Sequence, residues 1–183
     1  MGEEKNNEYY DNIFKKFKHY SLDVDGYNSP WNHLYKMVKG FLNKDDKILE
    51  LGCGTGQFAE VLINEGYDYV LGMDFSDEAI SMSKERCGKN TFVCENIYDF
   101  DFSKIDFDTA IALEIFEHIE QDLEVIRRFP KGKKLIFSVP QYDAGGHVRF
   151  YPNEKSVTDR FESIFTQIKI NNTGSIYVIK GIK

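Results

Sequence analysis

Residues 47–56 read KILELGCGTG, a short apolar run followed by three glycines at alternate positions. The run from Ile48 to Leu51 has the length and apolar content of a buried strand. Glycine has no Cβ, so it lets the backbone turn sharply and approach a ligand closely. A helical pattern begins directly after Gly56. The stretch therefore predicts a strand, a glycine-rich turn and a helix whose first N–H groups point at a bound molecule.

Short apolar runs alternate with helical patterns along the rest of the chain. Ser76 is expected to cap a helix that Gly88 ends, and Pro130 stops a later helix. Such alternation predicts βαβ units and a parallel sheet. The expected strands are residues 47–51, 69–74, 91–94, 109–113 and 134–139, then 165–170 and 175–179 on either side of a turn at 172–174.

The chain has 183 residues, of which 42% are hydrophobic and 29% charged, and a formal net charge of -7 at pH 7. These values predict one globular domain with no membrane span. The polar, acidic start from Met1 to Asn7 is unlike a secretory signal, so we expect a cytoplasmic location. The negative charge disfavours nucleic acid as a partner. Cys53, Cys87 and Cys94 include no CxxC pair, which argues against a disulfide or zinc framework.

Asp74 ends the second expected strand, about twenty residues after the glycine turn. An acidic side chain at this place in an α/β fold accepts hydrogen bonds from ribose hydroxyls. The dinucleotide fingerprint spaces its glycines as GxGxxG, whereas Gly52, Gly54 and Gly56 give GxGxG and Gln57 stands at the third position of that fingerprint. The pattern therefore favours a nucleoside ligand without a pyrophosphate.

Three stretches resemble motifs of the class I S-adenosylmethionine-dependent methyltransferases, in the family's order. They are residues 50–56 (ELGCGTG), 72–76 (GMDFS) and 107–114 (FDTAIALE). The resemblance implies an α/β, Rossmann-like fold, with a mostly parallel seven-stranded sheet, an antiparallel last strand and helices on both faces. It further implies a helical lid over residues 1–46 and a cofactor-binding domain over residues 47–183.

The resemblance also assigns residues to S-adenosylmethionine. Glu50 and the glycine loop would hold its amino-acid end, Asp74 its ribose, and Phe75 one face of its adenine. Asn96 stands where the family commonly has an acidic residue, and its carbonyl oxygen can still accept from the adenine amine. The full expected cofactor site is Glu50, Gly52, Cys53, Gly54, Gly56, Asp74, Phe75, Asn96, Ile97, Leu113 and Glu114.

The sequence Glu114-Ile115-Phe116-Glu117-His118 follows the fourth expected strand, and three interpretations of it remain open. His118, with His147, could act as a general base on an acceptor. Alternatively, Glu114, Glu117 and His118 resemble a divalent-metal motif of small-RNA 3′-end and ubiquinone-pathway methyltransferases, to which His147 could add a ligand. In the third, which we favour, these side chains brace the loop and no metal is predicted.

The function that the resemblance implies is methyl transfer to an oxygen or nitrogen atom of a small-molecule acceptor, with S-adenosylhomocysteine as product. Two alternatives are a non-catalytic cofactor-binding module that needs a partner subunit, and an NAD-dependent oxidoreductase. No membrane partner is expected. Candidates for the acceptor pocket are Tyr20, Tyr27, Trp31, His147, Arg149 and Phe150.

Overall fold

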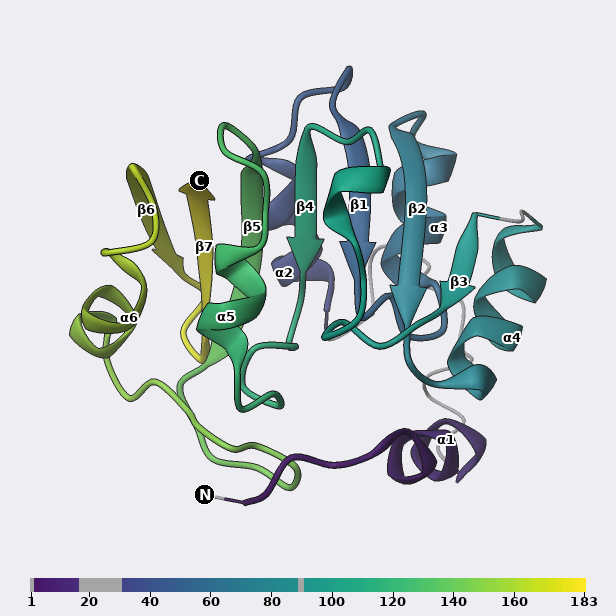
Figure 1. The fold of residues 1–183 in the computed structure, drawn as a ribbon, viewed down its shortest axis with the longest axis horizontal. Helices are drawn as coiled ribbons and strands as arrows, with labels where there is room; N and C mark the ends of the chain where they lie inside the picture. The colour runs from purple at the N-terminus through teal and green to yellow at the C-terminus, as the bar shows by residue number, and fades with distance from the viewer. Residues whose placement is uncertain (1, 17–30, 89–90) are drawn as a thin grey trace.

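The structure is a computed structural model that describes residues 2–16, 31–88 and 91–183. Its seven-stranded sheet has the order β3-β2-β1-β4-β5-β7-β6 (Figure 1). Strands β1 to β5 pair in parallel, and β7 runs antiparallel to both β5 and β6. This topology confirms the predicted fold class. The strands are β1 (Lys47–Leu51), β2 (Asp68–Asp74), β3 (Phe92–Cys94), β4 (Thr109–Ala112), β5 (Lys134–Pro140), β6 (Gln167–Asn172) and β7 (Ile176–Ile182).

The strand order reverses between β1 and β4, and this reversal positions the functional site. In the register, Leu51 lies beside Met73 of β2 on one side and beside Ala112 of β4 on the other. The segments that follow these three strands therefore leave the sheet at one edge and diverge, which opens a crevice there. Figure 1 shows the tips of β1, β2 and β4 at this edge, with α1 lying beyond it.

Helices cover both faces of the sheet. Alternate strand residues face opposite sides, so Ile48 packs with α2, α3 and α4, whereas Leu49 packs with α5 and α6. None of the helices in the described ranges is long and apolar enough to cross a membrane. They are α1 (Asn7–Lys16), α2 (Asn32–Lys39), α3 (Gln57–Asn64), α4 (Asp77–Cys87), α5 (Asp122–Arg127) and α6 (Glu154–Phe161), with a short 3-10 turn η2 at Phe102–Lys104.

The predicted ends of α4 are observed, whereas α5 ends at Arg127, before the predicted stop at Pro130. The Ser76 hydroxyl accepts from the Ala79 N–H at the start of α4, and Gly88 ends that helix with φ +60°. The sequence also predicts a helix start at Ser29 and Pro30, and these two residues lie outside the described ranges. The turn after β6 differs by one residue from the prediction, because Asn172 is still paired in the strand while its side chain accepts from the Gly174 N–H.

A buried ion-pair network joins α5 to α6. The carboxylate of Asp122, fully buried, accepts from both Nε and Nη2 of Arg160. Arg149 approaches the same carboxylate to 3.5 Å. A buried carboxylate needs such partners because its desolvation is costly. The network therefore fixes the helix that directly follows the loop bearing Glu114, Glu117 and His118.

We predict that Asp122→Asn lowers the free energy of unfolding by about 2–4 kcal/mol, since two guanidinium groups lose their shared counter-ion. The control Asp159→Asn removes only an exposed pair with Lys155 and should cost less than about 1 kcal/mol. Urea denaturation followed by circular dichroism measures both values. Equal effects in the two variants would show that the buried network does not stabilise the fold.

Candidate cofactor and acceptor site

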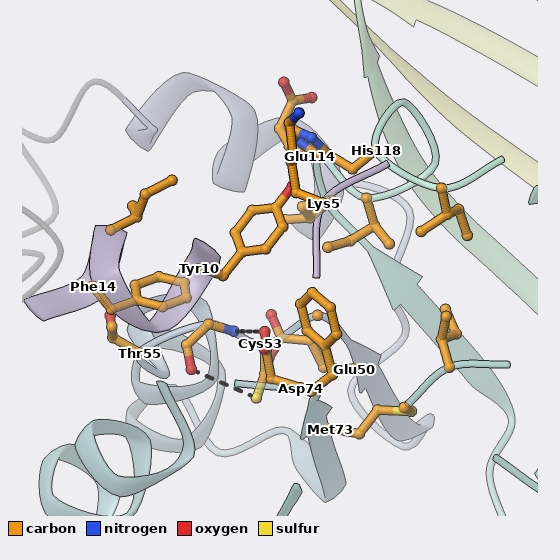
Figure 2. Close-up of a pocket in the computed structure, with 18 of the residues that line it drawn as sticks. Lys5, Tyr10, Phe14, Glu50, Cys53, Thr55, Met73, Asp74, Glu114 and His118 are labelled. Atoms are coloured by element: carbon orange, nitrogen blue, oxygen red, sulfur yellow. Dashed lines mark hydrogen bonds between the residues drawn. The ribbon is translucent and has the colours of Figure 1, made fainter. Parts of the chain in front are cut away.

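A cavity of about 410 Å³ opens at the carboxyl edge of the sheet, between β1, β2 and β4 and beneath α1 (Figure 2). Its volume lies in the range of small-molecule sites. Twelve of the residues predicted for the site line it: Glu50, Gly52, Cys53, Gly54, Asp74, Phe75, Asn96, Ile97, Leu113, Glu114, His118 and His147.

The glycine loop forms one wall, and three of its N–H groups are bonded within the protein. The N–H of Cys53 donates to Met73 O, that of Gly54 to the Asp74 carboxylate, and that of Gly56 to Cys53 O. We expected the loop and the helix behind it to point N–H groups at the ligand, and for these three groups that expectation is wrong. A pyrophosphate would need such free donors, so the loop suits a ligand that brings no phosphate.

Gly56 does not line the cavity, unlike the other predicted loop residues. A Cβ on Gly56 would lie 3.0 Å from the Cβ of Ser83 in α4, so this glycine allows α3 and α4 to approach each other. Gly54 differs, because a Cβ there would point toward the Phe14 ring at 3.9 Å, on the cavity side. The sequence pattern did not show that Gly56 serves helix packing while Gly54 faces the cavity.

Asp74 lies at the cavity floor, 8% exposed. Its two oxygens accept from the N–H groups of Gly54 and Ser76, at 3.0 and 2.9 Å. An ionised carboxylate offers about four lone-pair sites, so acceptor capacity remains for ribose hydroxyls. Burial raises the pKa of Asp74 to about 6, although the backbone donors oppose this shift.

Glu50 is a second buried carboxyl group in the lining, and Tyr69 donates its hydroxyl to it at 2.6 Å. Burial raises the pKa of Glu50 to about 7, while the Tyr69 hydrogen bond lowers it and Asp74 raises it further. A cationic ligand beside Glu50 would favour the ionised form. The sequence did not indicate Tyr69 as a partner, because its pairing with Glu50 depends on the register of β1 with β2.

Asn96 and Ile97 follow β3 and line the cavity, as Phe75 does. The side-chain oxygen of Asn96 accepts from the Tyr98 N–H at 2.9 Å, which turns the loop toward the site. One lone pair of this oxygen is therefore used within the loop, and the second can accept from an adenine amine. The expected adenine contacts are grouped at this end of the cavity.

Glu114 has a positive φ of 55°, and it is the only residue other than glycine with a positive φ among the described ranges. Its N–H donates to Ser138 Oγ, and that hydroxyl donates back to the Glu114 carboxylate at 2.7 Å. A strained conformation persists when its surroundings hold it, and such residues concentrate at functional sites. Ser138, which lies in β5, was not predicted from the sequence.

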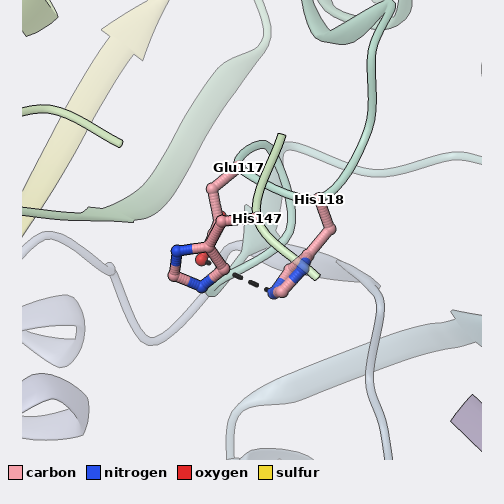
Figure 3. Close-up of side chains that lie close together, drawn as sticks. All are labelled: Glu117, His118 and His147. Atoms are coloured by element: carbon pink, nitrogen blue, oxygen red, sulfur yellow. Dashed lines mark ion pairs between the residues drawn. The ribbon is translucent and has the colours of Figure 1, made fainter. Parts of the chain in front are cut away.

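Glu117, His118 and His147 form a polar cluster at the acceptor end, in which one ligand atom from each lies within 4.8 Å of the others (Figure 3). The Nδ1 of His118 lies 3.1 Å from Gly146 O, which assigns the proton to Nδ1 and leaves Nε2 unprotonated, 3.9 Å from Glu117 Oε1. Burial lowers the pKa of His118 to about 4. Burial also lowers the pKa of His147.

Both carboxylate oxygens of Glu117 and Nδ1 of His147 are buried without a hydrogen-bond partner among the described residues. Burial, followed by the nearby Glu114 carboxylate, raises the pKa of Glu117. Unpartnered buried polar atoms are costly, so these atoms fit a bound group that satisfies them. A cation beside Glu117 would favour its ionised form, and one carboxylate with two uncharged imidazoles suits a divalent cation. His147 joins this cluster in place of the predicted Glu114, whose carboxylate bonds to Ser138.

Arg149 does not line the acceptor pocket, and this corrects our expectation. Its guanidinium donates to the carbonyl oxygens of Phe116, Ile119 and Glu120, so it braces the loop that carries Glu117 and His118. This contact agrees with the bracing interpretation for the loop itself. Phe150 is also absent from the lining, Trp31 is present, and Tyr20 and Tyr27 lie outside the described residues.

The sequence predicted a helical lid over residues 1–46 but did not indicate which of its residues reach the cavity; several residues of the segment 2–16, which we call the strap, do so. The strap crosses the cavity and ends in α1, and it adds Glu4, Lys5, Tyr9, Tyr10, Ile13 and Phe14 to the lining. Figure 2 shows Tyr10 between the Cys53 and Asp74 end of the cavity and the Glu114 and His118 end. No motif marks these residues, because only tertiary packing brings the strap to the sheet edge.

We predict that Gly54→Val prevents binding of S-adenosylhomocysteine, because a branched side chain would enter the cavity. The control Gly66→Val also places a branched residue at positive φ, but a Cβ there meets nothing within 4 Å. Both variants should lose stability by roughly 1–2 kcal/mol from the strained φ. Isothermal titration calorimetry should show binding by the control alone. Binding by Gly54→Val with unchanged affinity would place the ligand elsewhere.

Cofactor affinity should increase with pH between about 5 and 7.5. Ionised Asp74 and Glu50 accept hydrogen bonds and favour a cationic ligand, and their pKa values of about 6 and about 7 leave them protonated at low pH. Below these pKa values, each required ionisation weakens binding by up to about tenfold per pH unit. Calorimetry with S-adenosylmethionine measures the slope, and Glu50→Gln should flatten its upper part. A flat profile in the unsubstituted protein would contradict this electrostatic role.

Comparisons with known proteins agree with this geometry. Residues 48–131 match a family described as a methyltransferase domain. The chain is 27% identical over 124 residues to a ubiquinone biosynthesis O-methyltransferase of Aliivibrio fischeri, covering 65% of this chain and 48% of the relative. It is 39% identical over 54 residues to a ribosomal protein L11 methyltransferase of Thermotoga neapolitana, covering 30% of this chain and 20% of the relative. The chain thus spans about half or less of these relatives.

The fold also matches solved structures across the whole chain. Magnesium protoporphyrin IX methyltransferase from Synechocystis, with bound S-adenosylmethionine, superposes with a TM-score of 0.70 at 13% identity, and each chain is covered to 100%. At this identity the match establishes the fold alone. S-adenosylmethionine is the cofactor that the motifs, the cavity and the family have in common. Residues 48–131 thus match a methyltransferase domain, and the chain has the fold of the class I, Rossmann-like S-adenosylmethionine-dependent methyltransferases.

Proposed function

We propose that this chain transfers a methyl group from S-adenosylmethionine to an oxygen or nitrogen atom of a small-molecule acceptor. The observation that carries the proposal is one continuous cavity, lined at one end by the cofactor residues around Asp74 and at the other by His118 and His147. The strap covers this cavity, so the acceptor reaches a partly enclosed site. Such a site suits a small molecule, and the O-methyltransferase among the relatives supports an oxygen acceptor.

In this proposal the protein mainly aligns the reactants. S-adenosylmethionine supplies a methyl group that its sulfonium charge activates. Asp74 holds the ribose, and the buried carboxyl group of Glu50 lies beside the cationic end of the cofactor. Fixing the direction of attack and excluding water can lower the activation barrier by on the order of 7–11 kcal/mol.

His118 is the residue that we propose as proton acceptor. Its Nε2 is unprotonated and carries a lone pair, because Nδ1 donates to Gly146 O. The lowered pKa keeps the ring uncharged at neutral pH, so the lone pair is available. His147 lies with its ring 4.9 Å from that of His118 and would assist at the same point.

A divalent cation held by Glu117, His118 and His147 is the second candidate for activation. The unpartnered Glu117 oxygens and His147 Nδ1 favour it. Such an ion would supply positive charge beside an acceptor hydroxyl and lower the pKa of that hydroxyl.

The part of residues 1–46 that the structure describes agrees with a cover over a cofactor-binding domain of residues 47–183. The strap spans the cavity, and α2 packs Leu34, Tyr35 and Val38 against the sheet. We therefore propose the strap and α2 as two parts of this cover. Membrane and nucleic-acid partners are not part of the proposal.

The test is transfer of radiolabelled methyl from S-adenosylmethionine to a panel of catechols, sugars and amines. We expect turnover of at least one class, and His118→Ala should lower its rate about 10²-fold or more while cofactor affinity stays within about twofold. The control His33→Ala removes an exposed imidazole of α2 and should be fully active. If EDTA also abolishes turnover and a divalent salt restores it, the result supports activation by a divalent cation at Glu117, His118 and His147.

Absence of turnover over the whole panel, in a protein that binds S-adenosylmethionine, would favour the alternative of a binding module that needs a partner subunit. The NAD-dependent alternative has a separate test, because a tight ligand raises the melting temperature of the folded protein. S-adenosylhomocysteine should raise it and NAD should not.

A further inference from the structure

Tyr10 of the strap lies between the cofactor end and the acceptor end of the cavity. Its ring centroid is 5.3 Å from that of Phe75, beside the expected adenine position. On its other side, the ring meets His118 edge-on with centroids 5.8 Å apart. Figure 2 shows Tyr10 in this intermediate position. One side chain therefore contacts both halves of the site.

The hydroxyl of Tyr10 is buried and has no hydrogen-bond partner among the described residues. It lies at the polar cluster, because a Cβ on Gly146 would be 3.6 Å from this hydroxyl and 3.5 Å from His118 Nδ1. The unpartnered oxygens of Glu117 and Nδ1 of His147 belong to the same cluster. Several unpartnered polar atoms in one place indicate a polar ligand that completes them.

The strap is fastened on both sides of Tyr10. Before it, the Glu4 carboxylate accepts from the Tyr98 hydroxyl and from the Glu120 N–H, both at 2.7 Å. After it, the Asp11 carboxylate accepts from Ser76 Oγ and from the Glu78 N–H at the start of α4. These contacts hold the Tyr10 hydroxyl in place by packing rather than by a hydrogen bond of its own.

We infer that Tyr10 is a catalytic residue whose hydroxyl binds the acceptor nucleophile at the point of methyl transfer. The inference rests on the proposed function and adds a residue to it. The Tyr10 oxygen accepts a hydrogen bond from the acceptor hydroxyl or amine, and this leaves a lone pair directed at the methyl carbon. That lone pair forms the new bond to carbon, the carbon–sulfur bond breaks, and sulfur keeps its electron pair. The proton of the nucleophile passes to the Tyr10 oxygen while Tyr10 gives its own hydroxyl proton to His118 or to solvent, so that Tyr10 ends uncharged.

The test uses sinefungin, a cofactor analogue in which a carbon bearing an amine replaces the sulfonium and its methyl. The amine occupies the position of the transferred methyl group, so it reports on groups at the transfer point without a known acceptor. In Tyr10→Phe, sinefungin affinity should fall about tenfold, as expected for loss of a hydrogen bond to a charged group, while S-adenosylhomocysteine affinity stays within about twofold. Calorimetry measures both.

Tyr67→Phe is the matched control, since Tyr67 lies outside the cavity lining and stacks with Lys44. It should leave both affinities unchanged. A thermal melt of Tyr10→Phe establishes that the variant is folded. Equal loss of sinefungin and S-adenosylhomocysteine binding would mean that the ring only shapes the cavity, and unchanged binding of both would remove Tyr10 from the transfer point. Either result overturns the inference.

The binding result for Tyr10→Phe can be distinguished from the result of the acceptor panel that tests the proposed function. If no acceptor in the panel is methylated but Tyr10→Phe discriminates between the two ligands, the proposed acceptor class fails and the inference stands. If an acceptor is methylated and Tyr10→Phe retains full sinefungin affinity, the inference fails alone. With an acceptor in hand, Tyr10→Phe should lower kcat and leave the KM for S-adenosylmethionine unchanged.

Discussion

The hydrogen bond from the Gly54 N–H to the Asp74 carboxylate ties the glycine loop to the end of β2. This contact is possible because Leu51 and Met73 are neighbours in the sheet, so the two chains leave β1 and β2 side by side. A side chain at Gly54 would be strained at φ +53° and would stand on the cavity side of the loop. The floor of the cavity therefore depends on one glycine, one carboxylate and the parallel register of two strands.

Two carboxyl groups at the cofactor end of the cavity are buried. Asp74 and Glu50 are buried, and burial raises the pKa of both carboxyl groups. Burying ionisable groups this close to one another is unfavourable unless a ligand of opposite charge accompanies them. S-adenosylmethionine carries a sulfonium and an ammonium group, and a pyrophosphate would add negative charge instead. The charge of these buried groups thus agrees with the methyltransferase domain that residues 48–131 match.

The acceptor end is organised by different contacts. Arg149 bonds to three carbonyl oxygens of the loop after β4, and Val148 donates its N–H to Glu117 O. These bonds bring His147 next to His118, although the two residues belong to separate loops of the chain. The strap then covers the cluster, and its amino end is tied to the same segment by the Gly2 N–H, which donates to His147 O. Loop, brace and strap converge on one group of unpartnered polar atoms.

The sequence by itself determined the strands, most helix ends, the fold class and the cofactor end of the site. These features depend on local patterns: alternation of apolar runs, caps such as Ser76, and a glycine turn with Asp74 at a fixed distance. Only the tertiary structure decided that Gly56 serves helix packing, that Arg149 braces a loop, that His147 rather than Glu114 joins the polar cluster, and that Tyr10 enters the cavity. Each of these depends on contacts between segments far apart in the chain, and the direction of a side chain across such a contact is set by packing, which leaves no periodic signal in the sequence.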